Sequence, residues 1–206
     1  MNRREHWENV FSRKQEDEVS WYQPLPKSSI EFFESHELPF DANIIDVGSG
    51  DSYFIDYLVD RGYKNIYALD ISEHALSRLR IRLGKRGNTV QWIVSDILNF
   101  KTDIKFDYWH DRAAFHFLSD TTDIDKYIQI SSTYINADGK LMIATFSESG
   151  PEKCSGLNVK HYSKAELEHQ FENYFHKIKC ENEVHQTPFN TKQHFTFCSF
   201  LKKTVK

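Results

Sequence analysis

Cysteine is scarce in this sequence. Its three cysteines, Cys154, Cys180 and Cys198, show neither a CxxC pair nor a Cys/His spacing that would hold a metal. An odd, small number of cysteines in a chain of 206 residues is typical of reduced intracellular thiols rather than of a disulfide framework. We therefore expect free thiols and no metal site.

Long apolar runs are also missing. No window approaches the roughly 20 apolar residues that a membrane helix needs. The charged start, MNRREHWENVF, lacks the apolar core of a signal peptide. These absences predict a cytoplasmic protein without a membrane partner.

Neither sign of charge dominates. Lys and Arg number 26 against 30 Asp and Glu, which gives a formal net charge of −4. Basic residues gather only in small clusters at Arg3-Arg4, Lys85-Arg86 and Lys202-Lys203. A nucleic-acid partner usually requires a broad basic surface, so none is expected.

What the chain does contain is a regular alternation of short apolar strands and amphipathic helices. The β-branched or apolar runs predict strands at 43–47, 65–70, 90–94, 106–110 and 139–146. Helical spacing predicts helices at 28–36, with Ser28 or Ser29 as its cap, and at 53–61, 73–83, 124–135 and 164–171. Two later runs, 175–183 and 194–202, flank a turn and predict an antiparallel hairpin.

This order predicts an α/β fold: a seven-stranded, mostly parallel, Rossmann-like sheet with helices on both faces and a C-terminal antiparallel hairpin. We expect one domain over 1–206. Within it, 1–40 forms a helical extension or lid and 41–146 the ligand-binding core. Residues 147–206 form a substrate-side loop, a helix and the terminal hairpin.

Acidic residues stand at three successive strand ends. The first strand ends in Asp46-Val47-Gly48-Ser49-Gly50, the second in Asp70 and the third in Asp96. Ligands of open α/β sheets bind outside the carboxyl ends of the strands. Together the glycine turn and these carboxylates predict an adenosine-containing ligand, with Asp70 on the ribose hydroxyls and Asp96 on the exocyclic amine.

The turn argues against a dinucleotide. The third glycine of G-x-G-x-x-G is replaced by Tyr53, and the carboxylates of Asp46 and Asp51 would repel a diphosphate. The same carboxylates suit a ligand with a cationic amino group and no phosphate. S-adenosylmethionine, with S-adenosylhomocysteine as its product, is such a ligand.

The segments IIDVGSGDSYF, YALDIS and IVSDILNF resemble the cofactor framework of class I methyltransferases, over about residues 43–146. HWENVF, VSWYQ and GPEKCSGL resemble segments of uncharacterised bacterial members of the type 11/12 group. The resemblance implies a methionine end lined by Asp46, Gly48, Ser49 and Gly50, with Asp111, Arg112 and Trp21 bordering the site. It also implies that Ile71 and Ile97 pack against the adenine.

The acceptor side is indicated by the fourth strand. His110, Asp111 and His116 are the concentrated acid–base groups at a strand end, which makes them candidate catalytic groups for positioning or deprotonating the acceptor. The alternative is a structural role, with Asp111 capping the next turn. Trp21 and Tyr22 are interpreted either as a lid over the pocket or as ordinary core aromatics.

Four functions remain open. The first is methylation of a small-molecule thiol, amine or carboxylate, by a monomer or homodimer. The second is methylation of a protein lysine side chain, which an acidic, aromatic-lined channel would favour. The third is RNA methylation, which is weakened because the sequence lacks the Asn/Asp-Pro-Pro-Tyr/Phe run of base-directed enzymes. The fourth is a non-catalytic cofactor-binding subunit.

Overall fold

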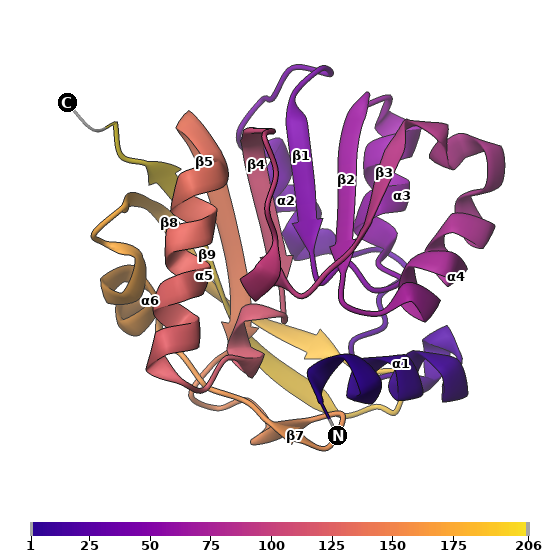
Figure 1. Cartoon of the computed structure of the whole chain (residues 1–206). Coiled ribbons are helices and arrows are strands. Elements are labelled where there is room, and N and C mark those ends of the chain that lie inside the picture. The colour runs from indigo at the N-terminus through magenta and orange to yellow at the C-terminus, as the bar shows by residue number, and fades with distance from the viewer. Residues whose placement is uncertain (1, 205–206) are drawn as a thin grey trace.

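The computed structural model describes residues 2–204. Strands alternate with helices through the first two thirds of the chain, and the strands assemble into one seven-stranded sheet (Figure 1). The strands of this sheet are β1 (Asn43–Val47), β2 (Asn65–Asp70), β3 (Val90–Val94), β4 (Phe106–Arg112), β5 (Ile135–Phe146), β8 (Phe175–Gln186) and β9 (Lys192–Lys202). The helices are α1 (Arg3–Arg13), α2 (Lys27–Glu34), α3 (Tyr53–Arg61), α4 (Glu73–Leu83), α5 (Thr121–Tyr134) and α6 (Lys164–Phe171).

The strand order is β3-β2-β1-β4-β5-β9-β8. The first five strands pair in parallel, whereas β9 runs antiparallel to both β5 and β8. The predicted Rossmann-like architecture with its terminal hairpin is therefore confirmed. The order reverses at β1 and β4, and this reversal opens a crevice at the carboxyl ends of those strands.

Each face of the sheet has its own hydrophobic core. One cluster joins α2, α3 and α4 to the sheet through side chains such as Phe33, Phe54 and Leu79. The other joins α5 and α6 through Tyr127, Leu167 and Phe171. Figure 1 shows these two helix layers on opposite sides of the strands. Successive strand residues point to opposite faces, so β4 sends His110 and Arg112 to one side and Trp109 and Asp111 to the other.

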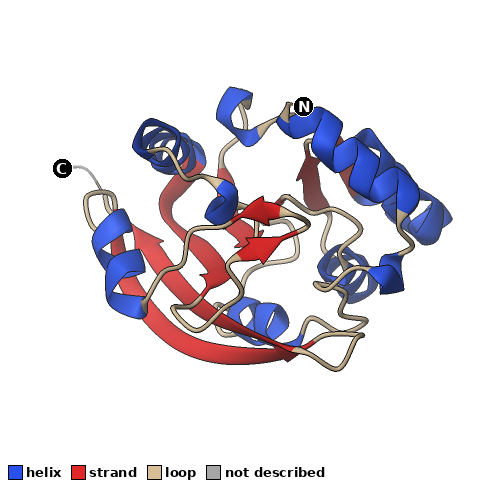
Figure 2. Ribbon diagram, turned by 90° about the horizontal axis from the view of Figure 1, so that it is seen from below, coloured by secondary structure: helices blue, strands red, loops and turns tan. Residues whose placement is uncertain are grey.

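Two boundaries differ from the predictions in ways that affect the site. Helix α2 begins at Lys27 with Pro26 as its N-cap, so neither Ser28 nor Ser29 caps it, and Ser29 is buried instead. The segment after β5, predicted as a substrate-side loop, contains the small hairpin of β6 (Lys153–Cys154) and β7 (Leu157–Asn158). From below the sheet, Figure 2 shows this short pair crossing in front of the main sheet.

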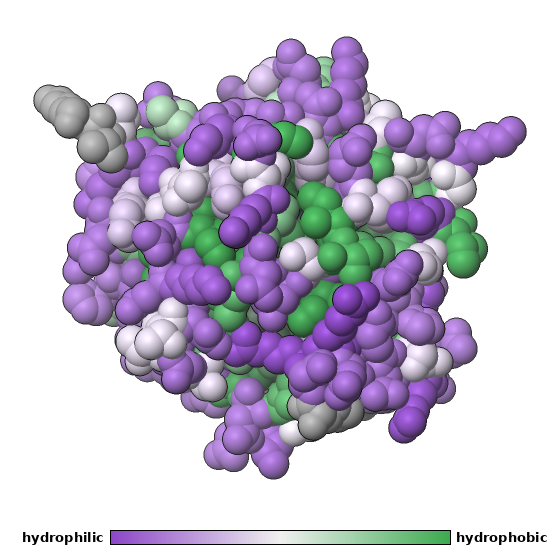
Figure 3. All heavy atoms as spheres, viewed as in Figure 1, coloured by the Kyte–Doolittle hydropathy of each residue, from purple (hydrophilic) through white to green (hydrophobic). Residues whose placement is uncertain are grey.

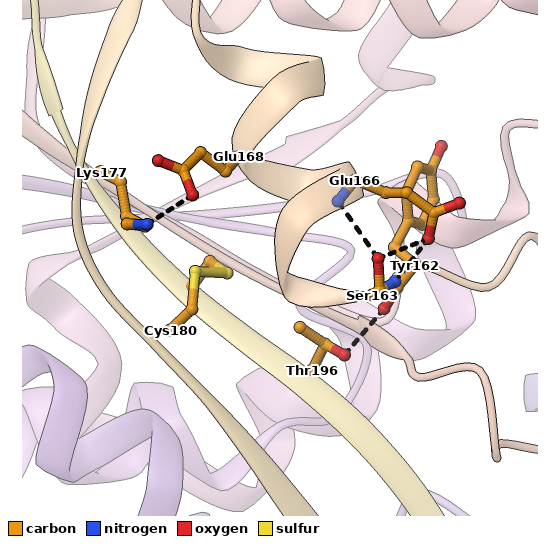
Figure 4. Close-up of a disulfide and its surroundings, with 8 residues drawn as sticks. Tyr162, Ser163, Glu166, Glu168, Lys177, Cys180 and Thr196 are labelled. Carbon is orange, nitrogen blue, oxygen red and sulfur yellow. Dashed lines mark hydrogen bonds and ion pairs between the residues drawn. A yellow bond between two sulfur atoms is a disulfide. The ribbon is translucent and has the colours of Figure 1, made fainter.

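The expectation of three free thiols is wrong for two of them. Cys180 on β8 lies directly opposite Cys198 on β9, and the two form a disulfide (Figure 4). Their partnership comes from strand register across 18 residues, which cysteine spacing alone does not reveal. Cys154 remains free and buried.

Among residues 2–204, no helix is long and apolar enough to cross a membrane. Hydrophilic side chains dominate the face seen in Figure 3, and apolar atoms show mainly near its middle.

Candidate functional site

The loops that follow β1 to β4 line one cavity together with the N-terminal segment and the hairpin. Most of the residues predicted to form the cofactor site meet there: Trp21, Asp46, Gly48, Ser49, Gly50, Asp70, Ile71, Asp96, Ile97 and Arg112, with His110 beside them. They come from separate strands, and the parallel sheet brings their ends to one edge.

The turn after β1 depends on glycine. Gly48 has φ +66°, and a Cβ there would lie 2.5 Å from the Cβ of Ala114. Gly50 has φ +52°, and a Cβ there would lie 3.2 Å from the ring of Phe11. The positive φ values and the close packing of Ala114 and Phe11 exclude a larger residue at either position, and the turn lines the cavity with its backbone.

Asp70 organises this edge. One carboxylate oxygen accepts the backbone N–H of Gly50 at 2.8 Å and the other accepts that of Ser72 at 2.8 Å. Burial raises the pKa of Asp70 to about 6, although these two hydrogen bonds act in the opposite direction. Each oxygen keeps a lone pair for a further donor, so the carboxylate is suited to a pair of hydroxyls.

Asp96 lies at the end of β3 and caps the next turn, because its side chain accepts the N–H of Leu98 at 2.9 Å. Its other oxygen lies 3.9 Å from the guanidinium of Arg3, which also pairs with Asp123. The N-terminal helix thus reaches the carboxylate that was predicted to bind an amine.

Asp46 and His110 form a buried pair between neighbouring strands, where they stand opposite each other in the β1–β4 register. The Asp46 carboxylate lies 2.6 Å from Nδ1 of His110, and Nε2 of that ring lies 2.9 Å from the Ser29 hydroxyl. Both ring nitrogens of His110 are therefore occupied. The second carboxylate oxygen of Asp46 is buried and has no hydrogen-bond partner among residues 2–204.

The structure does not bring Asp111 and His116 to the cavity. Asp111 points toward α5, where it accepts hydrogen bonds from the Tyr127 hydroxyl and from the N–H groups of Ala114 and Phe115. His116 is fully buried, and its Nδ1 accepts the N–H of Phe146 at 3.2 Å. Burial lowers the pKa of His116 to about 3. In this geometry both side chains hold the turn after β4 in place, and neither is among the residues that line the cavity.

An aromatic lid, defined here as Trp7, Phe11, Trp21 and Phe117, covers the cavity. The Trp7 ring lies 4.9 Å from that of Phe117 and 6.1 Å from that of Trp21, while Phe11 lies 6.1 Å from Trp21. Figure 1 shows α1, which carries the first two, beneath the carboxyl ends of β1 and β2. Trp21 both lines the cavity and packs against the hydrophobic core, so its interpretation as a lid stays a prediction. The sequence did not identify Trp7 and Phe11 as residues of this lid, because α1 has mixed charges and no clear apolar face.

Polar contacts fasten α1 to the core. Glu8 accepts the N–H groups of Glu73 and His74 and the hydroxyl of Ser72, so it caps the start of α4. Burial raises the pKa of Glu8, but these hydrogen bonds outweigh it and bring the value to about 2. Arg78 on α4 donates to the carbonyls of Phe11 and Lys14 and pairs with Asp51 at 2.8 Å.

The cavity continues toward β9 into a region where the sequence did not indicate Gln23, Gln193 or Phe195. It is lined by Tyr22, Gln23, Cys154, Gln193 and Phe195, together with Arg112. Gln23 and Gln193 are polar residues without a recognisable motif, and only the hairpin register brings Gln193 beside the N-terminal segment. Burial raises the pKa of the Cys154 thiol to about 11, so this group is a poor nucleophile.

Comparison with known proteins agrees with this geometry. Residues 40–201 match the family model described as a methyltransferase domain. Human EEF1A lysine methyltransferase 2 is 26% identical over 160 residues, which cover 70% of this chain and 68% of that protein.

Two solved structures share the fold at 16% identity. One comes from work on the conversion of a disulfide bond into a thioacetal group during echinomycin biosynthesis; its TM-score is 0.80, over 97% of this chain and 93% of that chain. The other is the 1,6-didemethyltoxoflavin-N1-methyltransferase of Burkholderia thailandensis with bound 1,6-didemethyltoxoflavin and S-adenosylhomocysteine. Its TM-score is 0.70, over 95% of this chain and 82% of that chain.

Fold, site and comparisons define an S-adenosylmethionine-dependent methyltransferase. The chain belongs to the methyltransferase domain family, whose model spans most of its length. The fourth alternative, a non-catalytic subunit, is set aside. The curated relatives are vertebrate proteins, so the expected proximity to bacterial members of the type 11/12 group is not confirmed.

The residues present fit S-adenosylmethionine. Asp70 keeps free lone pairs, the Gly48–Gly50 turn offers backbone, and the buried unpartnered oxygen of Asp46 suits an ammonium group. No group of three or more His, Cys, Asp or Glu side chains capable of holding a metal occurs within residues 2–204.

Proposed function

We propose that this enzyme methylates a small-molecule acceptor that enters the Arg112–Phe195 end of the cavity. The observation that carries the proposal is the lining of that end: it is roofed by the aromatic lid and carries a buried guanidinium where a lysine-binding channel would carry carboxylates. A cationic side chain would meet like charge there, whereas a neutral or anionic small molecule would not.

We further propose the following cofactor contacts. Asp70 accepts hydrogen bonds from the ribose hydroxyls, and Asp96 accepts one from the adenine amine. Ile71 and Ile97 pack on the adenine ring. Asp46 accepts the methionine ammonium, and the Gly48-Ser49-Gly50 turn presents its backbone to the same end. Their common position on the cavity wall supports these roles.

S-adenosylmethionine supplies an electrophilic methyl group and leaves as S-adenosylhomocysteine. The chain itself contributes alignment and exclusion of water. The lid covers the reacting centre, and β4 holds the acceptor wall in register with the Asp46–His110 pair. No unpaired carboxylate or imidazole lines the acceptor end in the part of the chain that the structure describes, which favours a nucleophile that needs no base, such as a thiolate.

Protein lysine methylation is the second candidate. It is supported by the human relative, which is named as a lysine methyltransferase. A lysine at pH 7 must lose a proton before it attacks, and His110, the imidazole in the cavity wall, is already engaged by Asp46 and Ser29. The expected monomer or homodimer and the cytoplasmic location stay predictions.

Methyl transfer into a cell extract separates the two candidates. Purified enzyme, methyl-labelled S-adenosylmethionine and extract are incubated, and the mixture is split by ultrafiltration. Label in the filtrate, beyond that of the cofactor and its breakdown products in an enzyme-free control, is the expected result. Label that stays on the filter and is released by protease would instead identify a protein acceptor.

A further inference from the structure

Arg112 forms part of the cavity wall with its side chain. It is the last residue of β4 and projects to the same side as His110, between the end of β1 and the hairpin. Its guanidinium carbon lies 5.2 Å from the ring centroid of Phe195. Nη1 donates to the backbone carbonyl of Trp21 at 3.2 Å, which fixes the plane of the group.

The other two nitrogens are free. Nε and Nη2 of Arg112 are buried and have no hydrogen-bond partner among residues 2–204. These two atoms form the side-on edge of the guanidinium, whose two parallel N–H groups match the two oxygens of a carboxylate. Burial lowers the pKa of Arg112 to about 10, although the charge of Asp46 acts in the opposite direction. Asp46 makes no hydrogen bond to Arg112; one of its carboxylate oxygens is bound to His110.

The wall around this edge is held by hydrogen bonds between distant segments. His185 on β8 lies 2.8 Å from the Ser20 carbonyl through Nε2, so Nε2 carries the proton and Nδ1 accepts from the Gln23 amide at 2.8 Å. Gln193 donates to the Ser20 hydroxyl at 3.0 Å, and its buried amide oxygen has no partner in the described chain. The segment 20–23 is therefore fixed before any acceptor arrives.

We propose that the side-on edge of Arg112 is a carboxylate-binding subsite and that the carboxylate belongs to the methyl acceptor. An unpaired buried guanidinium is costly, and a bidentate carboxylate satisfies both N–H groups at once. The free amide oxygen of Gln193 is an acceptor, so it suits an N–H or O–H donor elsewhere on the same ligand and not the carboxylate itself. This inference rests on the proposed small-molecule function.

The methionine end of the cofactor also carries a carboxylate. Arg112 contacts Trp21 and Phe195, which line the acceptor end, and this contact is the reason for assigning its free edge to the acceptor. A carboxylate held on both oxygens by a guanidinium is a weak nucleophile. The methylated atom therefore belongs to a second group of the same acceptor.

The acceptor fraction tests the chemistry of the ligand. Small molecules of the extract are passed through a strong anion exchanger at pH 11, where amino groups are uncharged and zwitterionic acids are also retained, and flow-through and salt eluate are assayed separately for methyl acceptance. Acceptance in the eluate that survives phosphatase treatment is the expected result. Acceptance confined to the flow-through, or abolished by phosphatase, overturns the carboxylate subsite while leaving the small-molecule function intact. Label found only on protein overturns the proposed function itself.

Variants test the residue. With the active fraction as substrate, Arg112→Gln is expected to raise KM tenfold or more. Arg112→Lys keeps the charge but loses the side-on edge, so its KM is expected to lie between those of the wild type and Arg112→Gln. Arg61→Gln, which removes an exposed guanidinium on α3, serves as the matched control. Circular dichroism and melting temperature establish that each variant folds.

Calorimetry with S-adenosylhomocysteine and 5′-methylthioadenosine, which lacks the amino-acid end, distinguishes the two sources of a carboxylate. Unchanged binding of both by Arg112→Gln supports the acceptor. Weaker binding of S-adenosylhomocysteine alone assigns Arg112 to the cofactor and overturns the acceptor assignment. Unchanged KM together with unchanged binding overturns the subsite.

Discussion

At the scale of single residues, the Asp70 carboxylate both stabilises the cavity wall and is available to bind a ligand. It holds the glycine turn through Gly50 and the start of α4 through Ser72, and it offers its remaining lone pairs to the cavity. A residue with this double role affects both the shape of the site and the ligand.

Asp70→Asn is expected to weaken binding of S-adenosylhomocysteine by about 1.5–3 kcal/mol, because hydrogen bonds to a charged group are lost. Isothermal titration calorimetry measures the change. Asp60→Asn, an exposed carboxylate paired with Arg86, is the control and should bind normally. Equal affinity in wild type and Asp70→Asn would remove Asp70 from the ribose contact.

The pH dependence of binding follows from the same residue. Its pKa of about 6 means that the carboxylate is ionised at pH 7.5 and protonated below pH 6. Affinity for S-adenosylhomocysteine is therefore expected to be constant above pH 7 and to fall by up to about tenfold per unit below pH 6. Titrations from pH 5 to 8 check this, and Asp70→Asn should lose this component of the decline.

The buried imidazole of His116 leads to a prediction about how the free energy of unfolding depends on pH. Its folded pKa is about 3 and its unfolded pKa about 6.5, so the unfolded state binds more protons between these values and stability falls as pH falls below 6.5. From pH 7.5 to 5.5, the unfolding free energy of wild type should drop by about 1.4 kcal/mol more than that of His116→Gln. Urea unfolding measures both. The exposed His169→Gln should behave like wild type; identical pH dependence in all three would mean that His116 is not buried as described.

At the scale of elements, the N-terminal helix is the part that the sequence described least. Helix α1 has mixed charges and few apolar positions, so its periodicity is weak, and its place is set by tertiary contacts through Glu8 and Arg78. Such contacts join residues more than 60 positions apart and leave no local signal.

Glu8→Gln is expected to loosen this helix, because a charged cap of α4 is replaced by a neutral one, at a cost of about 1 kcal/mol. The dissociation rate of S-adenosylhomocysteine should rise on the order of fivefold, as followed by stopped-flow tryptophan fluorescence of the lid. Glu31→Gln on α2 keeps the lid contacts and is the control. A rate unchanged by Glu8→Gln would show that α1 does not restrain the ligand.

At the scale of the whole molecule, the strand and helix pattern from Asn43 to Phe146 was predictable because each element is a local periodicity with a clear start and stop. Ser72 caps α4 and Gly62 ends α3 in the left-handed conformation, and both residue types favour these positions locally. The strand ends followed from topology, and with them Asp46, Asp70 and Asp96.

The acceptor end was not predictable in the same way. Whether Asp111 or Arg112 faces the cavity depends on the extension of β4 to Arg112, two residues beyond the predicted end. The register of β8 and β9 decides that Gln193 meets Ser20 and that Cys180 meets Cys198. Both are long-range properties of the folded chain.

One cavity, built from the ends of β1 to β3, is expected to hold S-adenosylmethionine. Calorimetric titration of the wild-type protein with S-adenosylhomocysteine, and separately with NAD, tests it most directly. We predict one S-adenosylhomocysteine per chain and no binding of NAD at the same concentrations, since Asp46, Asp51 and Asp70 repel a diphosphate. Binding of NAD with equal affinity, or no binding of S-adenosylhomocysteine, would mean that the cavity is not an S-adenosylmethionine site.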